Sequence, residues 1–215
     1  LLNSLLRALL RWGAALVFCL PLRHRSHFWA RACGMLLPLL LLAQLLDPLA
    51  QSTTLWQQQL LLLVLYVSFF ALLGGMIYLC TDINKKGALY CAVWSLLIAQ
   101  CAYEGWCFLE LQFTRHGHPL NMASPWAVLV QLLCGAVFFA AVYILLARQL
   151  PYKGDYHIGP RQLFSAFFIG ILFMVQAAVL DNARAEDTPL SLTVTILIGQ
   201  FYFITLLYFQ SELFK

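Results

Sequence analysis

The residues of this chain with the clearest capacity for chemistry lie on one helical face between positions 100 and 110. At the period of an α-helix, this face collects Gln100, Tyr103, Glu104, Cys107 and Glu110. The surrounding stretch is apolar for about the length of a membrane helix, and each carboxylate would cost about 2.5 kcal/mol or more if it faced lipid. We therefore expect these five residues, the polar stripe, to face protein or water.

The composition is typical of an integral membrane protein. Of the 215 residues, 62% are hydrophobic and 10% are charged, whereas soluble domains have about 45–50% apolar and about 25% charged residues. The seven cysteines lie almost entirely in apolar segments and lack the spacing of zinc ligands, so we interpret them as small apolar residues. The first residue is not Met and the last lies inside a helical pattern, so we expect both ends to be cuts in a longer protein.

The fold class expected from this composition is an all-α, polytopic bundle of transmembrane helices. A spanning helix needs about 20 mostly apolar residues, and seven segments meet this requirement: 3–21, 30–48, 56–79, 87–111, 125–147, 162–181 and 190–211. The first carries Arg7 and Arg11 one turn apart, so either these arginines reach outward to the surface or the segment does not span and the count is six. Pro38 is expected to kink the second segment.

Basic residues are distributed unevenly among the connections between these segments. The first, third and fifth connections and the C-terminal end hold nine, whereas the remaining connections hold two, Arg115 and Arg184; the nine are Arg23, Arg25, Arg31, Lys85, Lys86, Arg148, Lys153, Arg161 and Lys215. The positive-inside rule places the nine in the cytoplasm, which puts the N-terminus outside and the C-terminus inside.

This orientation places most other polar residues in the outer half of the bundle. Asp47 and Asp181 lie at the outer ends of two segments, and Trp106 and Trp126 lie nearby. The asymmetry predicts a cavity that is open to the outside and closed toward the cytoplasm. We expect the polar stripe to line this cavity and these four residues to surround its mouth. Such a ligand site suits a peptide or a small cationic or amphipathic molecule.

Each of these assignments has a structural alternative. The glutamines, which also include Gln44, Gln131, Gln176 and Gln200, often hydrogen-bond between membrane helices. Glu104 could be bonded to a glutamine or paired with Arg11, although an intramembrane carboxylate is by default a site residue. Glu110 fits a solvated rim equally well.

The sequence contains no enzymatic motif: no metalloprotease signature, no nucleophile elbow and no nucleotide-binding loop. We therefore assign no catalytic residue to this chain, and we expect no nucleic-acid partner. His116 and His118 could join Glu110 in a metal site, but a loop interpretation is simpler and we predict no metal. The absence of an internal repeat argues weakly against a transporter.

Two stretches resemble the membrane sensor domain of GHKL-type sensor histidine kinases, the broad group that includes the accessory gene regulator sensors. Residues 81–100, TDINKKGALYCAVWSLLIAQ, are similar to a turn and helix in the middle of such domains. Residues 197–215, LIGQFYFITLLYFQSELFK, resemble their last membrane helix, which we expect to continue unbroken past Lys215 into a signalling helix.

The resemblance implies a homodimer in the bacterial plasma membrane that detects an extracellular signal. It also implies that a cytoplasmic kinase domain follows Lys215, uses ATP and Mg²⁺, and phosphorylates a response regulator. The alternative from another functional class is a small-solute transporter or the substrate-binding membrane subunit of an uptake system. Surrounding lipid is a partner in either case.

The orientation leads to a prediction about labelling in intact cells. A cysteine introduced by Lys153→Cys lies in the fifth connection, on the cytoplasmic side, so a membrane-impermeant thiol reagent should not modify it beyond the background of the parent chain. Labelling of this cysteine before the cells are permeabilised would contradict the orientation.

Overall fold

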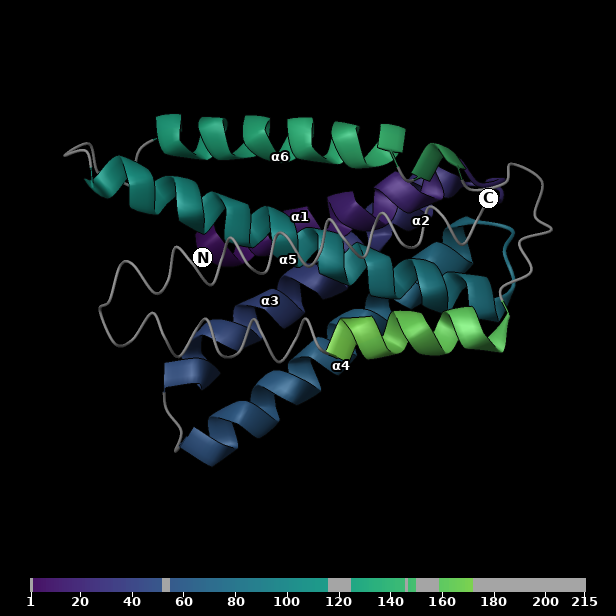
Figure 1. Cartoon of the computed structure of the whole chain (residues 1–215), viewed down its shortest axis with the longest axis horizontal. Coiled ribbons are helices and arrows are strands. Elements are labelled where there is room, and N and C mark those ends of the chain that lie inside the picture. The colour runs from purple at the N-terminus through teal and green to yellow at the C-terminus, as the bar shows by residue number, and fades with distance from the viewer. Residues whose placement is uncertain (1, 52–54, 116–124, 146, 150–158, 172–215) are drawn as a thin grey trace.

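The computed structural model describes residues 2–51, 55–115, 125–145, 147–149 and 159–171, and these segments are almost entirely helical (Figure 1). The helices are α1 (Leu2–Cys19), α2 (Phe28–Gly34), α3 (Leu36–Gln51), α4 (Leu55–Cys80), α5 (Lys85–Arg115), α6 (Pro125–Leu145) and the short η1 (Ala147–Gln149). A further helix covers residues 160–171. Within the described residues the only β-type pairing is an isolated bridge between His24 and Thr81. The all-α prediction is confirmed.

Two of these helices contain stretches that are long and apolar enough to cross a membrane, Leu63–Cys80 in α4 and Trp126–Leu145 in α6. The seven-span count therefore stays a prediction. The segment expected at 190–211 and most of that at 162–181 lie outside the described residues, as does the predicted continuation of the last helix.

The second predicted segment is divided into two helices rather than kinked at Pro38. The division falls at Met35, between α2 and α3, and Pro38 is the third residue of α3. A proline is tolerated in the first turn of a helix because the amide hydrogen that it lacks would have no partner there.

Helix α5 lies at the centre of the bundle, packed against α1 and α4. Its residues 90–100 are all buried, whichever side of the helix they occupy. Nearly all of these residues are apolar, and a helix that is apolar all round is stable only where other helices surround it. The hydroxyl of Ser95 in this stretch donates to the carbonyl of Cys91 at 2.7 Å, so it needs no partner from another helix.

Contacts between side chains fix the directions of the outer helices. Leu10 and Gly13 of α1 face Gly135 and Phe139 of α6, so these two helices run in the same direction. A Cβ atom on Gly13 would lie 3.0 Å from the Phe139 ring, so glycine permits this close approach. The helix at 160–171 lies along α4, where the rings of Phe70 and Phe167 are 5.5 Å apart.

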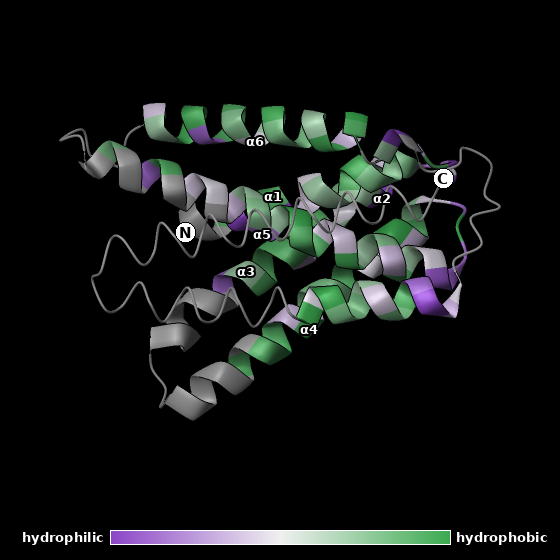
Figure 2. Cartoon of the chain, in the orientation of Figure 1, coloured by the Kyte–Doolittle hydropathy of each residue, from purple (hydrophilic) through white to green (hydrophobic). Residues whose placement is uncertain are grey.

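One end of the bundle, here called the basic end, is where α1, α4 and α6 finish and where α5 and the helix at 160–171 begin (Figure 1). Figure 2 shows hydrophilic residues gathered there. The basic residues of this end are Arg23, Arg25, Arg31, Lys85, Lys86, Arg148 and Arg161.

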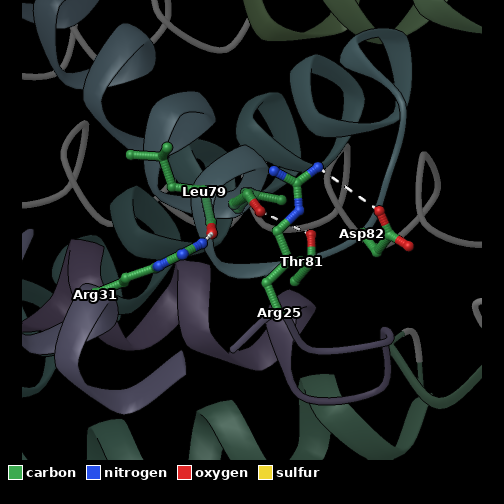
Figure 3. A network of polar contacts seen from close by, with 6 residues as sticks. Arg25, Arg31, Leu79, Thr81 and Asp82 are labelled. Carbon is green, nitrogen blue, oxygen red and sulfur yellow. Dashed lines mark hydrogen bonds and ion pairs between the residues drawn. The ribbon is translucent and has the colours of Figure 1, made fainter. Parts of the chain in front are cut away.

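Backbone and side-chain contacts join the connection before α2 to the connection before α5 at this end (Figure 3). The Arg25 amide donates to the carbonyl of Cys80 at 3.0 Å, and the Asp82 amide donates to the carbonyl of Arg23 at 2.9 Å. The Arg31 guanidinium donates to the Leu79 carbonyl at 2.8 Å, which satisfies one of the carbonyls left open at the end of α4.

The ion pair between Arg25 and Asp82 adds little to this junction. Its atoms are 3.6 Å apart and the two side chains are 33% and 60% exposed, and exposed pairs contribute about 0–1 kcal/mol. The paired backbone groups and the Arg31 bond therefore hold the two connections together. The described basic connections thus share one end of the bundle, as the topology prediction requires, while the side of the membrane stays a prediction.

Candidate functional site

The packing of α5 changes where the polar stripe begins. Gln100 is the last residue of the fully buried stretch, with 6% of its surface exposed. Beyond it, Tyr103 and Glu110 are half-buried, and Phe113 is 44% exposed. Residues 90–100 of α5 are therefore closed on all sides, whereas the part of the helix that carries most of the stripe is partly open.

The remaining predicted site residues fall in different places. Glu104 and Cys107 lie on α5 and Asp47 lies on α3, but their side chains are outside the described residues, as is the whole of Asp181. Trp106 is buried, at 4% exposed, and Trp126 at the start of α6 is 73% exposed. Only Trp126 of the two tryptophans therefore presents aromatic surface, and the shared mouth that we expected stays a prediction.

Arg7 of α1 contacts the polar stripe directly. Its Nη2 donates a hydrogen bond of 2.7 Å to the hydroxyl of Tyr103, and its Cζ lies 4.7 Å from the centroid of the same ring. The phenol thus offers this cation both an oxygen acceptor and the negative face of its ring. The contact joins positions 96 residues apart and sets α1 against the open half of α5.

Arg11 lies one turn further along α1, deeper in the bundle, and is 7% exposed. Its Cζ is 3.9 Å from the centroid of the Phe69 ring on α4. Its Nη1 is buried and has no hydrogen-bond partner, and the described side chains include no ion-pair partner for it. Burial of an unpaired charge costs several kcal/mol, while a desolvated cation–π contact returns about 2 kcal/mol or more. Arg11 is therefore a buried cation whose charge is only partly compensated.

The expectation that the two arginines reach outward is wrong for Arg11, which is buried against Phe69. Arg7 contacts Tyr103, and the alternative that the first segment does not span stays a prediction. The available signal was their spacing of four residues, which gives α1 a polar face like that of α5. The sequence does not show that these two faces meet, because that depends on how the helices rotate against each other.

Three further side chains in the described part of the chain have buried polar atoms without partners: Gln131, Trp106 and Trp94, whose indole nitrogen lies in the closed stretch of α5. Gln131 is 2% exposed, and neither its amide nitrogen nor its oxygen has a hydrogen-bond partner. It lies one turn before Gly135 on the side of α6 that faces α1. The indole nitrogen of Trp106 is likewise unpartnered. The interhelical hydrogen bond that was the structural alternative for Gln131 is therefore not found here.

Metal binding receives no support from the described side chains, which contain no group of three His, Cys, Asp or Glu residues placed to hold an ion. His116 and His118 lie outside the described residues.

Comparison with known proteins gives no match: no protein-family model, no curated protein and no solved structure matches this chain. The similarity to kinase sensor domains therefore stays an expectation based on the two stretches described above.

The contact between Arg7 and Tyr103 predicts an effect on stability. Tyr103→Phe removes the hydroxyl acceptor but keeps the ring, so we expect the free energy of unfolding to fall by about 1.5 kcal/mol, the low end of the range for hydrogen bonds to charged groups, because this contact is only partly buried. Chemical unfolding of the purified protein in detergent micelles measures the change.

The matched control is Tyr143→Phe on α6. Tyr143 is also half-buried, and no hydrogen bond to its hydroxyl is found among the described residues. Equal changes in the two variants would mean that the bond to Arg7 contributes nothing measurable.

Proposed function

We propose that this chain is the signal-sensing membrane domain of a two-component sensor histidine kinase. It binds an extracellular signal in an outward-facing cavity and relays it through the last helix to a cytoplasmic kinase domain. The observation that supports this most is the division of α5 into a half closed on all sides at residues 90–100 and a partly open half that carries most of the polar stripe.

A closed inner half favours a receptor over a transporter. A transporter must offer polar groups to its substrate along the whole path and usually does so with broken helices near the middle of the membrane. The inner half of α5 is continuous helix, and its two largest side chains, Trp94 and Tyr90, are 2% and 3% exposed. The transporter or uptake-subunit alternative therefore requires a path elsewhere in the bundle.

The setting that we propose is the bacterial plasma membrane, with the basic end in the cytoplasm and the N-terminus outside. The gathering of the basic connections at one end supports this orientation, because the positive-inside rule requires them to share one face of the membrane. A homodimer and seven spans complete the proposal and rest on the resemblance and the sequence pattern.

The ligand that we propose is an extracellular peptide or a small amphipathic or cationic molecule. Acidic residues expected near the outer opening, Glu110, Asp47 and Asp181, would attract its positive groups. Trp126, 73% exposed at the beginning of α6, provides an aromatic surface at that end. The arginines of α1 add positive charge deeper in the bundle, so the site is not uniformly acidic.

The most direct test of the kinase assignment is the coding sequence that follows Lys215. We expect a helical segment with a phospho-accepting histidine and then a domain that binds ATP and Mg²⁺ and phosphorylates a response regulator. A stop codon within a few residues of Lys215 would exclude the assignment.

Mutation of Glu104 tests its role in sensing. Glu104→Gln keeps the size and hydrogen-bonding capacity of the side chain but removes its charge, so we expect normal amounts of protein in the membrane and loss of the response to culture supernatant that contains the signal. A reporter gene controlled by the response regulator measures the response.

Glu104→Leu is the companion variant, because it also removes the hydrogen-bonding capacity. If Glu104→Gln responds normally while Glu104→Leu fails to assemble, Glu104 has a structural role and the site assignment is wrong.

A further inference from the structure

Arg11 holds a positive charge inside the bundle with nothing described beside it that carries the opposite charge. The side chain is 7% exposed, its Nη1 has no hydrogen-bond partner, and its nearest charged neighbour on the same face, Arg7, is also positive. Two like charges one turn apart destabilise a helix. Among the described side chains, Arg11 is therefore a buried cation without an anion, and a bound anion would reduce the cost of that burial.

The contact with Phe69 determines which part of the guanidinium is left for an anion. The ring lies 3.9 Å from Cζ and so occupies one side of the group. The N–H groups of a guanidinium point outward in its plane, and the Nη1 nitrogen of Arg11 is buried without a hydrogen-bond partner. A planar anion in line with Nη1 would accept from this edge without displacing Phe69.

The surroundings of Arg11 contain further hydrogen-bonding groups. Since α1 and α5 run in opposite directions and Arg7 meets Tyr103, a step of one turn along α1 to Arg11 corresponds to a step of one turn back along α5 to Gln100. On α4, Tyr66 precedes Phe69 by three residues and so lies on the same side of that helix. Arg11 interacts electrostatically with the phenol groups of Tyr66 on α4 and Tyr103 on α5, and Gln100 occupies the matching turn of α5.

We propose that Arg11 binds the carboxylate of an amphipathic ligand that enters along the polar stripe. A carboxylate is planar, carries one negative charge and matches the edge of a guanidinium, whereas a phosphate would bring more charge and more oxygens than the single unpartnered nitrogen, Nη1, can satisfy. The inference deepens the proposed function and rests on it. A peptide carries both a positive and a negative group: its amines would lie at the acidic mouth and its terminal carboxylate at Arg11.

The experiment uses the full-length protein, as its gene encodes it, in nanodiscs of zwitterionic lipid. The probes are octanoate, octylamine and octanol, which share a chain and differ in the charge of the head group, and the readout is the midpoint of thermal unfolding against probe concentration. We expect octanoate alone to raise the midpoint in a saturable manner.

The variant Arg11→Met removes the guanidinium and keeps a long apolar side chain. We expect it to fold, because it takes an uncompensated charge out of the interior, and to bind octanoate about tenfold or more weakly, as the loss of a charge-assisted hydrogen bond requires. The control is Arg148→Gln, which removes one exposed positive charge at the basic end. It should bind octanoate as the unmodified protein does.

Three results would overturn the inference: equal shifts with octanoate and octylamine, unchanged octanoate binding by Arg11→Met, or no octanoate binding by the unmodified protein. Arg11→Met protein that does not fold would also overturn it, because the charge would then be required for the structure itself.

The two proposals fail separately. If octanoate does not bind but Glu104→Gln still abolishes signalling, only the carboxylate site is wrong. If octanoate binds in the expected way but no kinase is encoded after Lys215, the sensor assignment is wrong and the site remains.

Discussion

The packing of α5 on all sides is the constraint on which the rest of the bundle depends. Eleven consecutive residues, 90–100, are buried whichever way they point, so α1, α4 and the helix at 160–171 must approach closely around them. Glycines allow this close approach: Gly74 of α4 faces Ala92 of α5, and Gly170 of the helix at 160–171 faces Val93 of α5. A similar contact joins α1 and α6, where Gly13 faces Phe139. Because residues 90–100 are closely packed, the polar stripe lies at and beyond the last of them, Gln100.

The polar stripe and the arginines of α1 are two parts of one arrangement. A carboxylate or a guanidinium in a bundle of this composition needs a partner, an aromatic face or water. Arg7 has the oxygen and the ring of Tyr103, and Arg11 has the ring of Phe69. The described contacts therefore form a mixed surface, in which the cations of α1 face aromatic side chains of α4 and α5.

The basic end differs from the stripe, because backbone groups take part in most of its bonds and most of its charged side chains are exposed. Its two connections are tied by amide–carbonyl bonds and by the Arg31 side chain, whose bond to the Leu79 carbonyl is drawn in Figure 3. Lys85 and Lys86 begin α5, where positive charge opposes the helix dipole. Asn84 offsets part of that cost by accepting from the Gly87 amide at 2.7 Å. The placement of two lysines at this unfavourable position is easier to understand if the membrane surface, and not the helix, determines where positive charge belongs.

The sequence by itself determined the helical class, the approximate limits of the described helices and the common face of the stripe, because these follow from apolar length and from the 3.6-residue period. It also indicated which connections should lie together, since charge near a membrane depends on composition more than on packing. Only the tertiary structure decided that α1 turns its arginines toward Tyr103 and Phe69, that Trp106 is buried while Trp126 is exposed, and that the second segment divides at Met35. Each of these depends on the rotation and depth of one helix against its neighbours, which is set by the fit of side chains from distant parts of the chain and leaves no periodic signal in any single segment.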